Sequence, residues 1–422
     1  MTETMLERRA RLLGPQMTTF YREPVHVVRG EGAYLWDKDG RRYLDCYNNV
    51  PHVGHCHPRV VEAIATQAAT LNTHTRYVHD AILDYGEALT AKFGHGLESL
   101  VMVCSGSEAN DVALRMAEAM TGKTGIIGTD NTYHGNTAAV SQLNSKKIPV
   151  GGYRDHVRQV PAPDNMAPIG GSQEGQAEAF ARGVEAAIAE LEESGHGVAA
   201  MILCPYFANE GFPTLERGFL DRAIEAVRKA GGIIIADEVQ PGFGRIGSHW
   251  WGHDRLGFAP DIVTLGKPMA NGHPVAAVVT RPEILGAFQE AFKYFNTFGG
   301  NPVSAAAAMA VLQVIEEEAL VENARDVGAY TLSLLQEVQA RHDVIADVRG
   351  AGLFLGAELW RDGAPATALC AEVVEDMRGR GVLLHSVGRR DNTLKVRPPC
   401  VFGRAEAETL AEVMDAALEA VT

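Results

Sequence analysis

The 422-residue sequence lacks the features that would place it in a membrane or on a nucleic acid. No apolar run approaches the roughly 20 residues that a membrane-spanning helix needs. Residues 1–16 lack the long apolar core of a secretory signal peptide. Positive charge is scarce, because 38 Lys and Arg residues face 53 Asp and Glu residues and the net charge is −15. This balance disfavours nucleic acid partners, and we expect a cytoplasmic protein without a membrane partner.

Paired cysteines are also missing. None of the six cysteines belongs to a CxxC motif, so we expect free thiols in a reducing compartment. The stretch "GHCHP" places His55 and His57 two residues apart, but no second cluster with metal-ligand spacing accompanies it. We therefore expect no metal site.

The residues that are present indicate an ordinary globular protein, with 46% hydrophobic and 22% charged residues. From about residue 98, continuous apolar segments alternate with amphipathic helical patterns, which predicts an α/β fold with a mostly parallel sheet covered on both faces. In such sheets, ligands bind beyond the carboxyl ends of the strands. The expected strands are "LVMVC", "GIIGT", "VAAMILC", "GGIIIADE", "DIVTLG" and "PVAAVV".

The pattern changes after about residue 305, where a long helix from Pro302 precedes the apolar segments "GLFLGAEL", "GVLLHSV" and "TLKVRPP". Near the N-terminus, "AYLWDKDGRRYLDCYN" predicts a hairpin with Asp39 and Gly40 in its turn. We expect a smaller α+β domain formed by the N- and C-terminal parts of the chain. The predicted division is an N-terminal segment 1–58 that joins the small domain, a large domain 59–305 and a C-terminal small domain 306–422.

A GxGxxG pattern at Gly242, Gly244 and Gly247 raises the possibility of a dinucleotide site. That site needs its first glycine at the strand end and a helix directly after the last. Here five residues separate the apolar run from Gly242, and we expect no helix in the following "SHWWGHDRLGFAP". The dinucleotide interpretation therefore fails.

Three other features together predict a pyridoxal 5′-phosphate (PLP) site. "CSGSEAND" places Gly106 and Ser107 at a helix start, where backbone amides bind phosphate, although an ordinary helix cap has the same composition. Asp237 ends an apolar strand, and a buried carboxylate there needs a cationic partner such as a pyridinium nitrogen. Lys267 lies in a turn between two strands, where an uncharged amine is a nucleophile toward carbonyls, although a solvated loop lysine is the simpler alternative.

The motifs "SGSEAND", "YHG", "IADEVQPGFGR", "PDIVTLGKP", "NGHPVAAVV" and "FGGNP" occur in an order that resembles the class III aminotransferases, which are PLP enzymes of fold type I, over nearly the whole chain. The resemblance implies that Lys267 forms the Schiff base and that Asp237 pairs with the pyridinium nitrogen. It also implies a dimer with shared active sites. The further cofactor contacts that it implies are Gly106 and Ser107 at the phosphate, Tyr133 and Val239 on the two ring faces, Gln240 at the phenolic oxygen, and Thr297 at the phosphate of the neighbouring subunit's site.

Two departures from that family weaken the case for transamination. Class III aminotransferases usually bind the substrate carboxylate with an arginine three positions before Pro-Pro, where "LKVRPP" has Lys395. A glutamate usually gates that arginine, and the corresponding position in "CPYFANEG" is Asn209, with Glu210 one residue further on. A shifted register could restore the gate at Glu210.

Other residues favour binding of a phosphorylated amine. "NNVPHVGHCHP", "NTHTR", "GKPMANGHP" and "FNTFGGNPVS" look most like the phospholyase subgroup, which includes ethanolamine-phosphate and 5-phosphohydroxylysine phospho-lyases. Lys395 and Arg397 are two apart on an expected strand and so share a face. The expected phosphate ligands are Asn48, Asn49, Arg76, Lys395 and Arg397, although Arg76 and Arg397 could instead form structural ion pairs.

The resemblance thus implies a PLP-dependent lyase that expels phosphate from the β carbon of O-phosphoethanolamine or 5-phosphohydroxylysine, with Lys267 as the base. The alternatives are a class III aminotransferase of the ω-amino acid or alanine–glyoxylate type, and a catalytically inactive binding protein on the same fold. The sequence alone leaves the choice between these two substrates open. It also does not distinguish a dimer from a tetramer.

Overall fold

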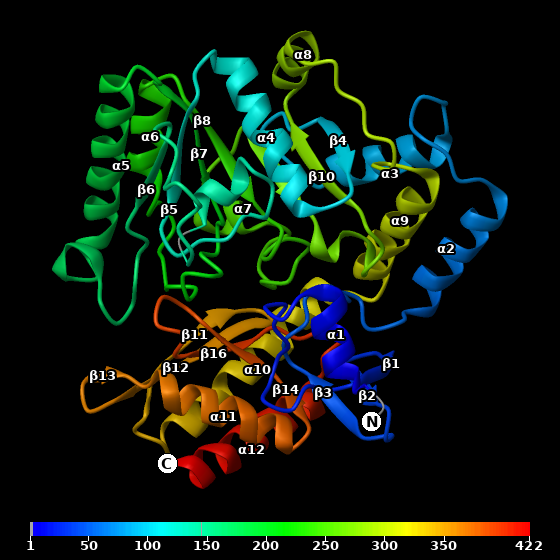
Figure 1. Ribbon diagram of the computed structural model, residues 1–422, viewed down its shortest axis with the longest axis vertical. Coiled ribbons are helices and arrows are strands. Elements are labelled where there is room, and N and C mark those ends of the chain that lie inside the picture. Colours follow the sequence, from blue (N-terminus) through cyan, green and yellow to red (C-terminus); the bar gives the residue numbers. More distant parts are fainter. Residues whose placement is uncertain (1–2, 145) are drawn as a thin grey trace.

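The computed structural model describes residues 3–144 and 146–422, and a seven-stranded sheet forms the centre of its upper half (Figure 1). Neighbouring strands are parallel except at β10, which is antiparallel to both of its neighbours. This arrangement confirms the expected mostly parallel sheet. In spatial order the strands are β4 (Ser99–Val103), β10 (Ala276–Thr280), β9 (Ile262–Leu265), β8 (Ile233–Asp237), β7 (Val198–Leu203), β5 (Gly125–Thr129) and β6 (Val157–Val160).

Helices cover both faces of this sheet, and the strand period of two decides which side chain meets which helix. Ile233 and Ile235 belong to the same apolar cluster as residues of α4 (Gly106–Thr121). Ile234 belongs to the opposite cluster, with residues of α5 (Gln176–Glu193) and α6 (Asp221–Lys229). The continuous apolar run is therefore explained by burial on both faces.

The lower half of the molecule combines the two ends of the chain (Figure 1). The N-terminal strands β1 (Val27–Glu31), β2 (Tyr34–Asp37) and β3 (Arg42–Asp45) are extended by β14 (Val382–Leu383), which pairs with β3 in parallel. A second sheet is antiparallel throughout. Its strands are β11 (Ile345–Ala351), β12 (Phe354–Arg361), β16 (Thr393–Val396) and β15 (His385–Val387), with β13 (Ala364–Pro365) paired to β12.

The remaining helices surround these sheets. The predicted boundary between residues 305 and 306 falls within helix α9 (Pro302–Glu317). The division of the chain into domains stays a prediction. No described helix has the length and apolarity needed to cross a membrane. The helices are α1 (Met5–Leu13), α2 (Pro58–Thr70), α3 (Asp80–Thr90), η1 (Val140–Leu143), η2 (Ile169–Gly171), α7 (Gly252–Leu256), η3 (Lys267–Ala270), α8 (Pro282–Ala291), α9 (Pro302–Glu317), α10 (Leu320–Gln339), α11 (Thr367–Gly379) and α12 (Arg404–Val421).

The apolar segment "GVLLHSV" contains two strands, because β14 and β15 lie in different sheets and Leu384 separates them. One local expectation is wrong. The stretch after the GxGxxG pattern does contain a helix, since α7 begins at Gly252. Glu238 explains this short helix, because its buried carboxylate accepts hydrogen bonds from the amides of Gly252 and His253 at 2.9 and 2.8 Å.

Candidate active site

A cavity lies beyond the carboxyl ends of β4, β7, β8 and β9, at the edge of the sheet where ligands are expected. Seven of the residues predicted from the sequence line it together. Three further lining residues, His134, Gly135 and Cys204, were not predicted to contact the cofactor. The full lining is Gly106, Ser107, Tyr133, His134, Gly135, Cys204, Asp237, Val239, Gln240 and Lys267.

Asp237 reaches this cavity because it shares a strand face with Ile233 and Ile235, toward α4. Its carboxylate is buried but well partnered. Oδ2 accepts a hydrogen bond from Asn110 Nδ2 at 2.9 Å and lies 2.6 Å from His134 Nδ1, while Oδ1 accepts from the Val239 amide at 3.0 Å. The carboxylate is therefore held in one orientation at the cavity wall, where a pyridinium nitrogen could meet it.

Lys267 begins the short helix η3 and points its side chain into the same cavity. Solvent reaches the side chain through the cavity, although protein atoms surround it. The resulting desolvation lowers the pKa of Lys267, the positive charge of Arg397 lowers it further, and Asp237 opposes both effects. A lowered pKa supplies the uncharged amine that attack on a carbonyl requires.

The start of α4 forms the expected anion cradle. Ser105 caps the helix and accepts a hydrogen bond from the Glu108 amide at 3.3 Å. Within the described part of the chain, the amides of Gly106 and Ser107 have no hydrogen-bond partner. A Cβ at Gly135 would lie 2.6 Å from Ser107 Oγ, so only glycine allows this close approach. Two free amides at the N-terminus of a 16-residue helix fit a phosphate group such as that of PLP.

The other predicted ring contacts also lie where PLP would need them. Val239 and Gln240 are buried in the cavity wall, while Tyr133 is 43% exposed at its rim. The guanidinium of Arg397 donates to Gln240 Oε1. This bond leaves the Gln240 NH2 group oriented as a donor for a ligand oxygen. The cavity thus offers an anion cradle, a carboxylate, a lysine and an amide donor, which fit PLP.

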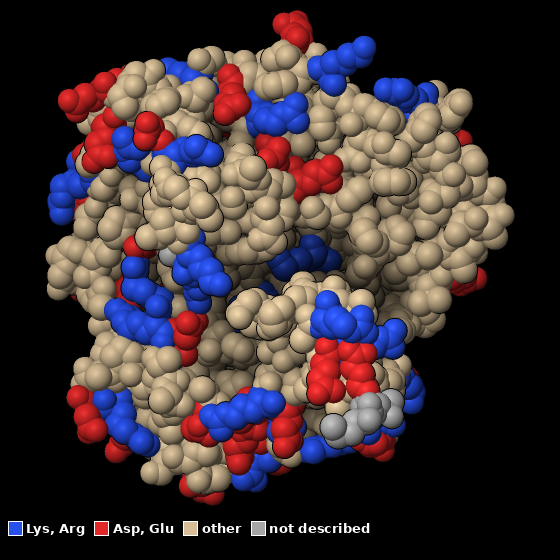
Figure 2. Space-filling model, in the orientation of Figure 1, with Lys and Arg blue, Asp and Glu red and all other residues tan. Residues whose placement is uncertain are grey.

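Lys395 and Arg397 are both buried beside this cavity, and both cationic groups lie 5.4 Å from the centre of the Tyr47 ring. Lys395 lies in β16 and Arg397 directly follows its last residue, Val396, so the expectation that one strand carries both stays a prediction. Among the described residues, no carboxylate forms an ion pair with either of them. Burial lowers the pKa of Arg397 to about 10. Burial, followed by the charges of Arg397 and Lys267, lowers the pKa of Lys395 well below its usual value. Figure 2 shows Lys and Arg side chains at the floor of a hollow between the two halves of the molecule.

The two asparagines of "YNNV" lie in the loop that carries Tyr47. Asn49 is buried, and its Nδ2 has no hydrogen-bond partner in the part of the chain that the structure describes. Asn48 accepts a hydrogen bond from the Val50 amide at 3.1 Å and lines a neighbouring cavity with Tyr47 and Phe20. A buried donor without a partner is costly unless a ligand oxygen binds it.

Arg76 and Thr297 are not brought into the cavity of this chain. Arg76 is exposed, and its guanidinium lies 3.8 Å from the centre of the Phe295 ring. Thr297 is exposed in the same region, beside Phe298. Neither residue belongs to the lining of the cavity in its own chain.

The alternative gate at Glu210 is not formed. The Glu210 carboxylate is buried and accepts a hydrogen bond from Thr129 Oγ1 at 2.7 Å, and Lys395, at the position of the gated arginine, forms no ion pair with a described carboxylate. Neither Asn209 nor Glu210 lines the cavity. The glutamate–arginine switch of class III aminotransferases therefore has no counterpart at these positions.

The histidines of "GHCHP" have carboxylate partners of their own. His55 Nε2 lies 2.7 Å from Asp45, and His57 Nε2 lies 3.1 Å from Glu318. Residues 3–144 and 146–422 contain no group of three or more His, Cys, Asp or Glu side chains placed to hold a metal ion.

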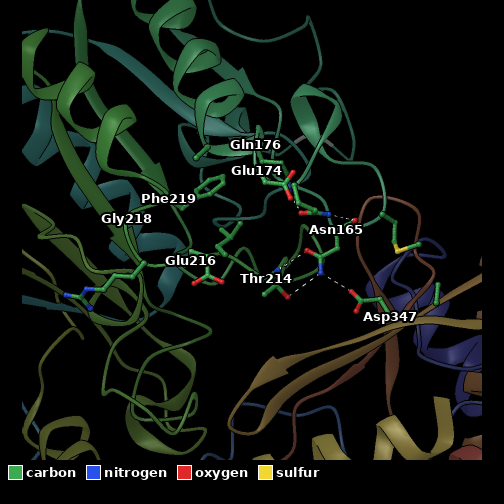
Figure 3. A pocket seen from close by; sticks show the side chains of 14 residues that line it. Asn165, Glu174, Gln176, Thr214, Glu216, Gly218, Phe219 and Asp347 are labelled. Atoms are coloured by element: carbon green, nitrogen blue, oxygen red, sulfur yellow. Dashed lines mark hydrogen bonds between the residues drawn. The ribbon is translucent and has the colours of Figure 1, made fainter. Parts of the chain in front are cut away.

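A larger cavity of about 780 Å³ lies elsewhere, between α5 and β11 (Figure 3). Its lining includes the carboxylates Glu174, Glu216 and Asp347, and Asn165 Nδ2 donates to Asp347 at 2.9 Å. None of the residues predicted for the site lines it. Its lining has three carboxylates and a single cationic side chain, Arg217, so it is a poor site for a phosphorylated ligand, and the smaller cavity is the candidate active site.

Comparison with known proteins agrees with this geometry. A model of the class-III aminotransferase family matches residues 18–418. An alanine–glyoxylate aminotransferase 2-like protein of Drosophila melanogaster is 42% identical over 96% of this chain and 85% of its own. Ethanolamine-phosphate phospho-lyase homolog 1 of Caenorhabditis elegans is 37% identical over 95% of this chain and 90% of its own.

A solved structure is similar over the whole molecule. A phospholyase from Arthrobacter in complex with phosphoethanolamine is 43% identical, covers 99% of this chain and 100% of its own, and has a TM-score of 0.95. Since the family match and the relatives extend over almost the entire sequence, the chain belongs to the class-III aminotransferase family of PLP fold type I, and this membership implies pyridoxal 5′-phosphate as its cofactor.

Proposed function

We propose that this protein is a PLP-dependent phospho-lyase that converts O-phosphoethanolamine into acetaldehyde, ammonia and inorganic phosphate. The observation that carries the proposal is the pair of buried cationic side chains Lys395 and Arg397, neither of which has an ion-pairing carboxylate among the described residues. Such cations are costly to bury and are stabilised by a dianionic ligand. The solved phospholyase that binds phosphoethanolamine supports the same substrate class.

The residues that would hold the cofactor are those that the sequence predicted. The amides of Gly106 and Ser107 would bind its phosphate, Asp237 its ring nitrogen and Gln240 its phenolic oxygen, while Lys267 would hold it covalently. When bound, PLP supplies an electron-accepting ring that acidifies the carbon bearing the substrate nitrogen. The side chains of Tyr133 and Val239 would lie on the two faces of the cofactor ring.

The chain's own groups account for the chemistry at the substrate. Lys267, as an uncharged amine, would remove the proton from the carbon that bears the substrate nitrogen. Asp237, which Asn110 and His134 hold in one orientation, would balance the positive charge of the cofactor's ring nitrogen. The C–O bond to the phosphate breaks with its electron pair on the departing oxygen, and water converts the remaining enamine to acetaldehyde and ammonia.

The phosphate of the substrate would be bound by Lys395 and Arg397, with the buried amide of Asn49 as a further donor and Asn48 close by in the same loop. Arg76 would reach the site from a second copy of the chain, as Thr297 would for the cofactor phosphate. Binding by these groups stabilises the negative charge that grows on the leaving phosphate oxygen. A shared site of this kind requires at least a homodimer.

A class III aminotransferase remains the second candidate, because the relative from Drosophila melanogaster carries an aminotransferase name. Against it stand a lysine at position 395, where the gated arginine is expected, and the hydrogen bond that holds the Glu210 carboxylate to Thr129. Elimination needs no keto acid, whereas transamination requires one. This difference separates the two functions in a single assay.

We expect the pure holoenzyme to release phosphate and ammonia from O-phosphoethanolamine without any keto acid. Inorganic phosphate is measured by a colorimetric assay and acetaldehyde by a coupled dehydrogenase. Parallel reactions contain 5-phosphohydroxylysine, which tests the second phospho-lyase substrate. Turnover only after addition of pyruvate or glyoxylate would make the protein an aminotransferase, and no turnover with either would favour the inactive binding protein.

The variant Lys267→Ala provides the control. It removes both the covalent anchor and the base, so we expect phosphate release to fall by at least about 10²–10⁴-fold and the visible absorbance of the lysine-bound cofactor to disappear. Retention of both signals would refute the role of Lys267. Far-ultraviolet circular dichroism of the variant verifies that the fold is unchanged.

A further inference from the structure

A second cavity, of about 350 Å³, adjoins the proposed phosphate site. Tyr47 and Asn48 belong to its lining, and the Tyr47 ring also lies 5.4 Å from the cationic groups of Lys395 and Arg397. Phe20, from the segment that follows α1, lines the cavity as well, and its ring centre lies 5.0 Å from that of Tyr47. The loop that carries Tyr47 is therefore shared between the phosphate site and this cavity.

Much of the remaining cavity wall is apolar, with Pro24, Val25, Leu35 and Leu383 among its residues. Such a wall suits an alkyl chain, because burial of methylene groups favours binding. O-Phosphoethanolamine has two carbons and ends at its phosphate, so it has no atoms that would occupy this space. A substrate whose carbon chain continues beyond the phosphate-bearing carbon does have such atoms.

Arg9, in α1, is the one cationic side chain among the described residues that line the cavity. It is half-buried, and its buried Nε has no hydrogen-bond partner in the part of the chain that the structure describes. No described carboxylate forms an ion pair with its guanidinium. A buried donor without a partner is costly unless a ligand oxygen binds it. A guanidinium is well suited to a carboxylate ligand, which it binds through two parallel hydrogen bonds.

The carboxylate of Asp45, which also lines the cavity, is already engaged by other groups. Its Oδ1 accepts hydrogen bonds from the amides of Tyr47 and Asn48 at 3.1 and 2.9 Å, and its Oδ2 lies 2.7 Å from His55 Nε2. Asp45 is therefore held away from Arg9 by its own partners. The guanidinium of Arg9 remains available to an anionic group of a ligand.

We propose that this cavity binds the carboxylate end of a longer phosphorylated amine, with Arg9 as the ligand of the carboxylate and the apolar wall around the carbon chain. The inference rests on the proposed function, because the phosphate of such a substrate would occupy the site at Lys395 and Arg397. 5-Phosphohydroxylysine has this chemistry, since its chain continues from the phosphate-bearing carbon to a carboxylate. Arg9 would thus determine how well the enzyme uses this amino acid relative to O-phosphoethanolamine.

The test compares phosphate release from the two substrates by the wild-type holoenzyme and by Arg9→Met, which keeps a straight side chain but removes the guanidinium. We expect the ratio of kcat/KM for 5-phosphohydroxylysine to kcat/KM for O-phosphoethanolamine to fall by at least about tenfold, through a higher KM for the longer substrate. The ratio is unaffected by any loss of folded enzyme. With 5-phosphohydroxylysine amide, which lacks the carboxylate, the wild type and Arg9→Met should have similar kcat/KM.

Arg8→Met is the matched control, because it makes the same change at an exposed neighbour in α1 that does not line the cavity. We expect it to leave the ratio unchanged. An unchanged ratio in Arg9→Met, an equal loss with the amide, or a wild type that releases phosphate from O-phosphoethanolamine alone would overturn this inference and leave the proposed function standing. Phosphate release from neither substrate would refute the proposed function, and the inference with it.

Discussion

At the scale of single residues, Lys395 is a side chain whose burial is costly, and the proposed phosphate ligand would offset that cost. It is 5% exposed and lies near the guanidinium of Arg397 and the amine of Lys267. No described carboxylate forms an ion pair with it. Burial of an uncompensated charge opposes folding, and the cost is offset only when an anion occupies the site.

We predict that Lys395→Met raises stability and weakens phosphate binding. Replacement of buried ionic groups by apolar residues of similar volume often stabilises proteins by about 1–4 kcal/mol, which denaturant unfolding in phosphate-free buffer would measure. Loss of one charge-assisted hydrogen bond should raise the KM for O-phosphoethanolamine by about 10- to 150-fold. A destabilised variant with unchanged KM would contradict both expectations.

The pH dependence follows from the lowered pKa of Lys395. Below that pKa the ammonium is charged in the folded and the unfolded protein, so its full destabilising effect is present there. As the pH rises toward the unfolded value of about 10.4, the effect disappears, and the stability advantage of Lys395→Met should shrink. Phosphate affinity should fall as the pH rises through the lowered pKa of Lys395, because the folded protein then loses the ammonium. The phosphate affinity of Lys395→Met should not show this fall.

At the scale of elements, the GxGxxG turn serves helix packing. Gly247 has a φ of +72°, and a Cβ there would lie 2.5 Å from the backbone nitrogen and Cα of Arg325 in α10. At Gly244 a Cβ would lie 2.4 Å from Val321 Cγ2, also in α10. The two glycines therefore allow the turn after β8 to pack directly against α10.

We predict that Gly247→Ala destabilises the protein by about 2–5 kcal/mol, the sum of about 1–2 for a left-handed alanine and about 1–3 for overpacking. Gly122→Ala is the matched control, because Gly122 has a φ of +67° and open space around it. It should cost only the about 1–2 kcal/mol of backbone strain. Equal losses in denaturant unfolding would show that the contact with α10 contributes nothing.

At the scale of the whole molecule, one surface stands out as apolar. It carries Tyr77, Val78 and Phe298, which are 65%, 90% and 72% exposed, together with Phe295 under the guanidinium of Arg76. Contiguous apolar surface of this kind marks protein interfaces. Since Thr297 and Arg76 lie on the same surface, a second copy of the chain placed there would carry both predicted ligands to the other site.

We predict that the wild-type protein is at least a dimer and that Phe298→Lys dissociates it, because a lysine in an apolar interface is desolvated. Size-exclusion chromatography with light scattering measures the mass. Met120→Lys, at an exposed apolar residue of α4, is the control and should leave the mass unchanged. A monomeric wild type, or an unchanged mass for Phe298→Lys, would contradict the shared active site.

Much of the fold follows from local pattern in the sequence. The six expected strands of the central sheet occur as β4, β5, β7, β8, β9 and β10, because each is a largely apolar run; β4, at the sheet edge, is half-buried, and the other five are buried along their whole length. β6 and β11 were not predicted, since polar residues interrupt their apolar pattern. The division of "GVLLHSV" between two sheets depends on pairing partners that are distant in the sequence.

The sequence by itself determined the chemistry of the cavity lining. Lys267, Asp237, Gly106, Ser107 and Gln240 each sit at the end of a predictable strand or the start of a predictable helix, and parallel strands bring such ends to one edge. Only the tertiary structure decided which side chains meet across that edge. The contacts of Glu210 with Thr129, of Asp237 with His134 and of Arg397 with Gln240 all join residues that are distant in the chain. Such contacts depend on how separate elements pack, which local pattern does not encode.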